Sequence, residues 1–375
     1  MITKRLFIAI LIATTSFGIF GCNRTKDGTG QTIPVGTILG LTGENSAYGI
    51  RMKKGLELAL EHANASKEGS GAQFRLAVED SQWEPRLGVS AYRKMHDVQG
   101  INHFAAICGS KIALAVCEGS RSDDIVIVDA ISGAPKLTNT AGPKYFRVYA
   151  SDAMAGTNNV TWALEEGAKT FAIAYVEDDW GASYKDAIVQ ALKYKGHHAQ
   201  IIPVTLSSRD FKNEVQKLSQ QPADAIFVVL YANLAVPFVK ELRTLGSEAK
   251  IYAGDNLSSS DFSAAGNEVT DGVRLSLPAE PDSSEYKKFA EAYRQKFGEE
   301  PDAFGLKSYD AFMLLAHAIR ATDGEAASVV NFLRAMPPYH GASGDLSFDA
   351  NGDLRNQSYK RQVYKSGKLE AFGKN

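Results

Sequence analysis

This sequence contains few cysteines and almost no excess of charge of either sign, and each of these two features excludes a class of protein. Three cysteines among 375 residues are too few for a scaffold held together by disulfides. Lys and Arg number 41 against 43 Asp and Glu, so the net charge is -2 and we expect no nucleic-acid partner. The composition, 44% hydrophobic and 22% charged, is that of a globular protein, and a chain of this length can bury a core without metal or disulfide staples.

Motifs of covalent and metal chemistry are absent too. The seven histidines are scattered without an HExxH pattern, and there is no CxxC pair, GxxxxGKS/T loop, GxGxxG turn after a strand, or GxSxG elbow. The adjacent Asp178 and Asp179 are interpreted as helix-capping residues, because neighbouring loop residues usually point apart. We therefore expect no enzyme activity, no metal site and no cofactor.

The N-terminus has the pattern of a processing signal. Two basic residues precede an apolar run, Leu6 to Ala13, which is too short to span a bilayer comfortably. The sequence Ile19-Phe20-Gly21-Cys22 resembles a bacterial lipobox. We expect removal of residues 1–21, lipidation of Cys22, and a tether over residues 22–32. The mature protein would then be periplasmic or at the cell surface, anchored to a membrane through its lipid. A plain signal peptide with a chance cysteine is the alternative.

Two cysteines, Cys108 and Cys117, would remain in the folded part of the exported chain. Cys108 ends an expected strand, and Cys117 lies about two turns into the helix that follows it. Such a separation exceeds the reach of a disulfide. We therefore expect two buried thiols.

Apolar strands alternate with amphipathic helices along the rest of the chain. This βαβα order predicts parallel strands with helices on both faces of each sheet. We expect strands at 33–41, 74–78, 104–108, 125–129, 171–176, 201–204, 225–230 and 251–253, and helices at 52–63, 85–96, 111–119, 153–166, 182–193, 211–218, 236–245, 284–297, 304–321 and 326–335.

The pattern divides into two α/β units, and no flexible linker separates them. This arrangement indicates a rigid molecule of two lobes. At the end of the chain, residues 344–348 and 359–364 are expected to form a closing hairpin, with its turn at Asn351-Gly352. A ligand cleft would lie where the carboxyl ends of the strands of both sheets face each other.

Small and hydroxyl residues are concentrated in the turns that follow the expected strands. Ser110 opens a helix directly after one strand, and a helix N-terminus with a hydroxyl donor suits a carboxylate. A similar turn spans residues 129–133. Trp180 and Tyr231 stand at the matching ends of strands in the second unit, where they could either line a cleft or pack in the core.

Six segments, in this order and spacing, resemble the leucine/isoleucine/valine-binding protein family, the class I periplasmic substrate-binding proteins of ABC importers. The likeness extends over residues 33–369, although no single motif is decisive. The segments are Gly40–Ala65, Ala77–Met95, Ala106–Val116, Tyr175–Ala187, Glu299–Ile319 and Gly344–Leu354.

The resemblance implies an α/β fold of two doubly wound parallel-sheet lobes with a hinge, of the type I periplasmic binding protein class. Three crossovers would fall near residues 147–151, 275–278 and 342–345. The first lobe would then comprise 33–148 plus 278–343, and the second 149–277 plus 344–375. The lobes would close over a small polar ligand, an amino acid of the branched-chain type or a relative. The protein, expected to be a monomer, would deliver this ligand to a membrane permease.

Site residues are carried over one at a time. Ser110 resembles the serine that binds the ligand carboxylate. The loop formed by Ile131, Ser132 and Gly133 would hold the ammonium and carboxylate groups, with Ser132 replacing a hydroxyl that the family often has near Gly133. Trp83 stands where one cysteine of the family disulfide would be, so that disulfide is expected to be absent.

The remaining predicted contacts are aromatic or acidic. Tyr48 and Trp180 resemble positions that line the cleft, and Tyr231 resembles a tyrosine of the second lobe. Asp255 lies within a residue of the acid that pairs with the ammonium, and Asn256 is its rival. If Asn256 faces the cleft, the ligand could be an amide, urea or an organic acid. A sensory module that uses the same pocket is the alternative to an importer component.

Overall fold

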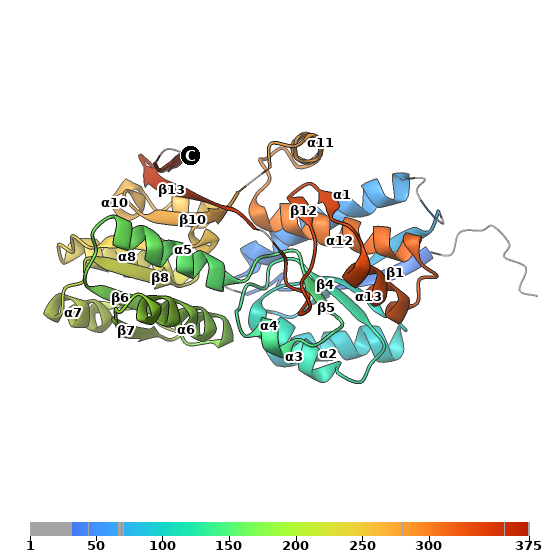
Figure 1. The fold of residues 1–375 in the computed structure, drawn as a ribbon, viewed down its shortest axis with the longest axis horizontal. Coiled ribbons are helices and arrows are strands. Elements are labelled where there is room, and N and C mark those ends of the chain that lie inside the picture. Colours follow the sequence, from blue (N-terminus) through green and yellow to red (C-terminus); the bar gives the residue numbers. More distant parts are fainter. Residues whose placement is uncertain are drawn as a thin grey trace, which may run out of the picture.

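The computed structural model describes residues 32–373, apart from 44, 67, 68, 70, 280 and 356. The expected signal peptide, the lipidation site at Cys22 and the tether up to residue 31 lie outside this range. Two lobes lie side by side along the long axis of the molecule (Figure 1). Within the described residues, no helix is long and apolar enough to cross a bilayer.

The first lobe contains a five-stranded parallel sheet in the order β2-β1-β3-β4-β5. Its central strands are continuous buried apolar runs, because helices cover both faces. The strands are β1 (Thr32–Leu39), β2 (Gln73–Asp80), β3 (His103–Ile107), β4 (Val126–Asp129) and β5 (Tyr145–Arg147).

Two groups of helices cover this first sheet. The helices α1 (Ser46–Ala65), α12 (Ala303–Ala321) and α13 (Ala326–Ala335) share one face, and α11 (Ser284–Phe297) packs outside α1. A Cβ on Gly55 would lie 2.0 Å from the Gly305 carbonyl oxygen, so glycine permits the close approach of α1 and α12. The other face carries α2 (Pro85–Arg93), a π-helical turn (Lys94–Val98), α3 (Ser110–Gly119) and the short α4 (Leu137–Thr140).

The second lobe contains a seven-stranded sheet in the order β14-β13-β10-β9-β8-β6-β7. Neighbouring strands from β7 to β10 are parallel, whereas β13 runs antiparallel to both β10 and β14. The strands are β6 (Phe171–Val176), β7 (Ala199–Val204), β8 (Ala225–Val229), β9 (Lys250–Ala253), β10 (Arg274–Pro278), β13 (Tyr359–Lys365) and β14 (Lys368–Ala371).

Helices cover both faces of this second sheet as well. Because the strand order reverses after β7, right-handed crossovers place α6 on one face and α7 and α8 on the other. The helices are α5 (Asp152–Glu165), which packs on α6 (Asp179–Tyr194), then α7 (Lys212–Gln220), α8 (Ala232–Thr244), a 3-10 turn (Asp255–Leu257), α9 (Ser260–Ser263) and α10 (Asn267–Thr270). Two doubly wound α/β lobes are therefore present, as predicted.

The predicted closing hairpin is wrong. The strand β12 (Gly344–Leu346) pairs instead with β11 (Tyr339–Gly341) in a small separate sheet. The strand β13 adds to the edge of the second sheet beside β10, where Val363 and Tyr364 become buried. A turn does form at Asn351-Gly352, but only one bridge, between Phe348 and Leu354, flanks it. Pairing of residues 359–363 with the whole of β10 takes the place of the local hairpin.

Three segments connect the lobes. The first, residues 148–151, joins β5 to α5, and the second follows β10 at residue 279. Residues 344–354 remain beside the first lobe, since Asp353 pairs with Arg147 and Phe348 packs on Phe146. We therefore propose that the second crossover begins after Pro278, at the end of the range that the sequence indicated. We propose that the third begins after residue 354, nine residues beyond the indicated range of 342–345.

Candidate ligand-binding cleft

A narrow cavity lies between the two lobes, near the carboxyl ends of their strands. About 50 Å³ is open to the centres of water molecules, which at about 10–15 Å³ each gives room for only a few waters. Six of the predicted site residues line it: Tyr48, Ser110, Ile131, Trp180, Tyr231 and Asp255. The other lining residues are Trp83, Gly109, Tyr149, Asp152, Asn256 and Phe304.

One end of the cavity is rich in hydrogen-bond donors. The helix α3 begins at Ser110, after Gly109 with a positive φ of 99°. The amides of Ile112 and Ala113 donate to the Gly109 carbonyl, whereas the first two amides, of Ser110 and Lys111, have no partner within the helix. The Ser110 hydroxyl oxygen accepts a hydrogen bond of 3.1 Å from the Ala134 amide, so its own proton remains to be donated. This end of the cavity suits a carboxylate.

Two buried carboxyl groups also line the cavity. Asp152 opens α5 and Asp255 opens the 3-10 turn after β9, and their exposed fractions are 5% and 7%. The Trp180 indole donates to Asp152 at 2.7 Å, and the Tyr149 hydroxyl donates to Asp255. Burial and then the neighbouring Asp255 charge raise the pKa of Asp152 to about 7. Burial also raises the pKa of Asp255. A ligand cation would relieve this cost.

Lys307 of α12 is a protein cation whose charge partly offsets the effect of burial on the pKa of Asp255. Lys307 is buried outside the lining, and its Nζ lies 3.2 Å from Ser343 Oγ and 3.3 Å from Gln357 Oε1. Burial lowers the pKa of Lys307 to about 8. Among the described residues that line the cavity there is no Lys or Arg.

Aromatic rings from both lobes enclose the cavity. Tyr48 packs edge-on against Phe304, with ring centroids 5.0 Å apart, and Trp83 packs edge-on against Tyr231 at 5.8 Å. Tyr231 also stacks on Trp180 at 4.8 Å. Since Tyr48 and Trp83 belong to the first lobe and Tyr231 to the second, these rings form an apolar contact across the cleft.

Asp178 fixes this aromatic wall from behind. Its carboxylate accepts from the Gly181 amide at 2.9 Å, which caps α6, and from the Tyr231 hydroxyl at 2.8 Å. The interpretation of Asp178 as a capping residue is therefore confirmed, whereas Asp179 instead forms an ion pair with Lys136.

Ser132 and Gly133 do not line the cavity. Ser132 is fully buried, its hydroxyl donates to the Ile107 carbonyl at 3.4 Å, and its own carbonyl accepts from Arg147. A Cβ on Gly133 would lie 2.2 Å from Asp152 Oδ2, so this glycine leaves the space that the acid occupies.

Asp255 and Asn256 both line the cavity, but their polar groups are used differently. The Asn256 amide donates to the Leu230 carbonyl at 2.8 Å, and its oxygen accepts from the Gly254 amide at 3.1 Å. Asn256 thus holds the ends of two strands together. The Asp255 carboxylate accepts from Tyr149 and is the better candidate for ligand contact.

Sequence reasoning missed Asp152, Tyr149 and Phe304, and noticed Trp83 only as the replacement of a cysteine. Asp152 looks like an ordinary acid in the first turn of a helix, so nothing local distinguishes it. The expectation for the thiols is confirmed: Cys108 and Cys117 are free and buried, and burial raises the pKa of both.

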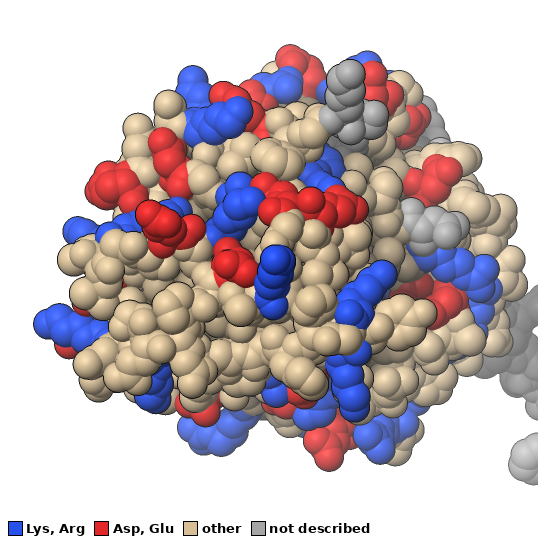
Figure 2. Space-filling model, turned by 60° about the vertical axis from the view of Figure 1, so that its left-hand side comes forward, with Lys and Arg blue, Asp and Glu red and all other residues tan. Residues whose placement is uncertain are grey.

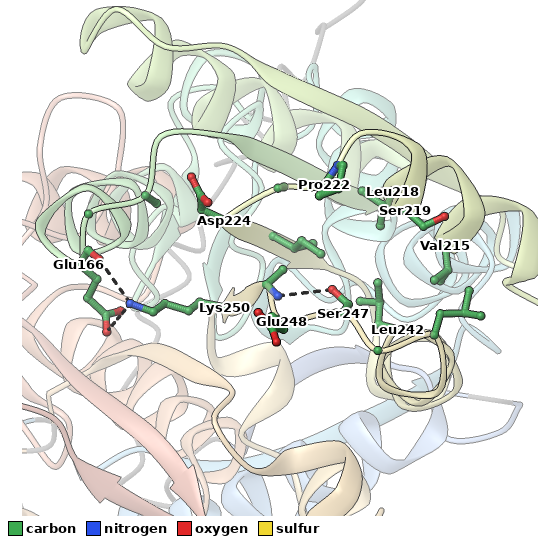
Figure 3. A pocket seen from close by; sticks show the side chains of 17 residues that line it. Glu166, Val215, Leu218, Ser219, Pro222, Asp224, Leu242, Ser247, Glu248 and Lys250 are labelled. Carbon is green, nitrogen blue, oxygen red and sulfur yellow. Dashed lines mark hydrogen bonds and ion pairs between the residues drawn. The ribbon is translucent and has the colours of Figure 1, made fainter.

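A larger groove of about 640 Å³ lies in the second lobe near the starts of β8 and β9 (Figure 3). Apolar side chains such as Leu218 and Leu242 form part of its wall, and its Lys250 pairs with Glu166 at 3.4 Å. None of the predicted site residues lines it.

On the face drawn in Figure 2, basic and acidic side chains are interspersed.

Comparison with known proteins agrees with this architecture. A family model described as periplasmic binding protein matches residues 32–368. A Leu/Ile/Val-binding protein homolog 1 from Brucella abortus is 23% identical over 369 residues, covering 97% of each chain.

Two solved structures share the fold. The leucine-binding protein LivK of Thermotoga maritima has a TM-score of 0.85 at 24% identity, covering 91% of this chain and 98% of its own. A solute-binding protein from R. palustris in complex with benzoate has a TM-score of 0.82 at 18% identity, covering 92% and 96%. With its two lobes and interlobe cleft, this chain belongs to the periplasmic binding protein family and is related to the Leu/Ile/Val-binding proteins of ABC transporters.

Proposed function

We propose that this protein is an extracytoplasmic solute-binding protein that captures a small amino acid, of the branched-chain type or a relative, and delivers it to an ABC importer. One observation carries the proposal: two buried acids, Asp152 and Asp255, share a single cavity with Ser110 at the start of α3. Such a cavity offers acceptors to an ammonium group and donors to a carboxylate, which are the two groups of a free amino acid.

The balance of charge supports a zwitterion. Burial disfavours the ionised forms of Asp152 and Asp255, and the described cavity lining supplies no basic side chain to offset them. An ammonium group would pair with these acids, while the helix N-terminus and Ser110 would receive the carboxylate. The aromatic rings leave room for only a few waters, so a ligand with a side chain of branched-chain size requires the lobes to move apart.

An organic acid without an amine is the second candidate. It is favoured by one observation, that a structural relative with a TM-score of 0.82 was solved with benzoate. Such a ligand would use Ser110 and α3 but would leave Asp152 and Asp255 buried without a cation. Amides and urea are further candidate ligands for the same cavity. A sensory protein would also bind its ligand there, and experiments distinguish it from an importer component.

A thermal-shift panel, followed by calorimetry, tests the proposal. The panel contains the standard amino acids, benzoate, 4-methylpentanoate, 3-methylbutylamine, acetamide and urea. L-Leucine and its two truncated relatives form a matched set, since each relative lacks one charged group. We expect an amino acid to stabilise the protein more than either truncated compound. Binding of benzoate or 4-methylpentanoate alone would select the organic-acid alternative, and binding of urea or acetamide would contradict both.

Delivery and anchoring have separate tests. Cys22, after the lipobox-like Ile19-Phe20-Gly21, should carry lipid, so that Cys22→Ser moves the protein from the membrane fraction to the soluble one. An intact mass of the mature wild type without an acyl group would contradict this. Uptake of the bound amino acid into vesicles containing the partner permease distinguishes an importer component from a sensor. Analytical ultracentrifugation tests the expected monomer.

A further inference from the structure

The indole nitrogen of Trp83 is a buried donor without an acceptor among the described residues. Trp83 is 7% exposed and lines the cavity. Buried donors are almost always paired, because an unpaired one loses its hydrogen bond to water without replacement. The Trp180 indole, in the same cavity, does have its acceptor in Asp152. Trp83 therefore carries an unused donor on a side chain that lines the cavity.

The backbone at Trp83 is held in an uncommon conformation. Gln82 and Trp83 have φ angles of 51° and 64°, a left-handed region that is rare for a bulky side chain. Local hydrogen bonds enforce it: the Gln82 amide donates to Asp80 Oδ1 at 2.8 Å, and the Glu84 amide donates to the Ser81 carbonyl at 2.8 Å. Strained residues of this kind persist where the surrounding structure fixes them, often at ligand sites.

Two glycines make room for the indole ring. A Cβ on Gly40 would lie 2.7 Å from Cε3 of Trp83, and a Cβ on Gly109 would lie 3.4 Å from Cζ2. Within the indole, Cζ2 belongs to the side of the ring that carries Nε1. The nitrogen is thus on the side nearest Gly109, the residue directly before Ser110 and the start of α3.

We propose that Trp83 is a specificity-determining residue whose indole N–H donates a hydrogen bond to the ligand carboxylate beside Ser110. This inference rests on the proposed function and deepens it. The sequence places no hydroxyl at Gly133, and Ser132 does not reach the cavity, so this loop supplies no side-chain donor to the carboxylate. Trp83 supplies a donor on the side of Gly109 and Ser110 instead, and it selects ligands that present an acceptor there.

Indole resonances test the contact directly in the wild-type protein. The chain has three tryptophans, so a 15N-labelled sample gives three indole N–H signals, assigned with Phe variants. Trp162 is the internal reference: its indole is also unpaired, but it lies outside the cavity lining, against Tyr252. We expect L-leucine or benzoate to move the Trp83 indole proton downfield and to leave that of Trp162 in place. The amine control, 3-methylbutylamine, should not produce the downfield shift.

The affinity arm uses Trp83→Phe, which keeps an aromatic ring against Tyr48 and Tyr231 but removes the donor. A hydrogen bond to a charged group is lost, so binding of the carboxylate should weaken by about tenfold to a hundredfold. Trp162→Phe should bind as wild type does. Binding of 3-methylbutylamine should be the same in wild type and Trp83→Phe.

The outcomes separate this inference from the proposed function. A carboxylate that binds the wild type without moving the Trp83 signal, or equally well to Trp83→Phe, overturns the role of Trp83 and leaves the proposed function standing. A wild type that binds no amino acid and no organic acid of the panel overturns both. The resonance measurement does not depend on the variant, so a poorly folded Trp83→Phe still leaves a decisive result.

Discussion

The indole nitrogen of Trp180 donates a 2.7 Å hydrogen bond to Asp152 Oδ2, joining α6 to the first turn of α5 at the wall of the cavity. This contact fixes the orientation of a carboxyl group that is almost wholly buried. Asp152 therefore has a defined place from which it could meet a ligand ammonium, and we expect such a ligand to change its charge.

The protonation of Asp152 should make ligand binding depend on pH. Its pKa of about 7 is far above the usual value of about 3.9 for Asp, so the native state binds more protons than the unfolded chain between these values. In the absence of ligand, this group's contribution to stability is therefore present at low pH and lost as pH rises towards 7. An ammonium ligand favours the ionised form, so its affinity should rise from pH 6 to pH 8.

Calorimetry in two buffers of different ionisation enthalpy should detect proton release on binding at pH 6.5. Asp152→Asn should bind an amino acid more weakly and lose most of the pH dependence in this range. A wild-type affinity that is flat from pH 6 to pH 8 would show that no ligand cation meets Asp152.

Ser110→Ala should weaken a carboxylate ligand. The hydroxyl provides one hydrogen bond to a charged group, which is worth about 1.5–3 kcal/mol, or about tenfold to a hundredfold in affinity. Ser132→Ala is the matched control, because this serine lies in the adjacent loop but outside the cavity lining. If titration calorimetry gives equal affinities for Ser110→Ala and wild type, Ser110 has only a structural role at the helix start.

The ion pair between Lys136 and Asp179 should slow ligand release. It joins the first lobe to α6 of the second at 2.7 Å, and both side chains are about half exposed. Exposed pairs contribute about 0.2–1 kcal/mol, so Lys136→Gln should speed dissociation by no more than about fivefold. Stopped-flow measurements at low and high salt should find this difference only at low salt.

Lys53→Gln is the control for this experiment, since Lys53 pairs with Glu57 within α1 alone. An equal effect of both variants would mean that the interlobe pair has no special part in closure.

The buried Arg147 should be important for stability. Its exposed fraction is zero, and it donates to Asp353 at 2.7 Å and to the carbonyls of Ser132 and Ala134 at 2.9 and 3.0 Å. Arg147→Met removes the cation that pairs with Asp353 and one donor from each of the two carbonyls, and it should lower the free energy of unfolding by about 3–5 kcal/mol.

Urea denaturation measures this loss against Arg361→Met, which removes a more exposed pair with Glu165 and should cost less than about 1 kcal/mol. Similar losses for the two variants would contradict the importance assigned to the buried pair.

Local periodicity determined much of the fold. The predicted strand 171–176 and the helices 284–297 and 326–335 coincide with β6, α11 and α13 as observed. These elements are strongly patterned. The start of α11 is also capped by Ser283, whose hydroxyl accepts from the Tyr286 amide. The α/β order, which is the sum of such local signals, also determined that both sheets would be mainly parallel.

Tertiary structure decided what depends on contacts between distant segments. The strand β13 pairs with β10 in the seven-stranded sheet rather than with residues 344–348 in a local hairpin, and Val363 and Tyr364 are buried there. Asp152 and Trp83 enter the cavity through a lobe crossover and a left-handed turn, neither of which has a periodic signal. Periodicity records which side of an element is buried, whereas a binding cavity is defined by the few side chains that converge from several elements.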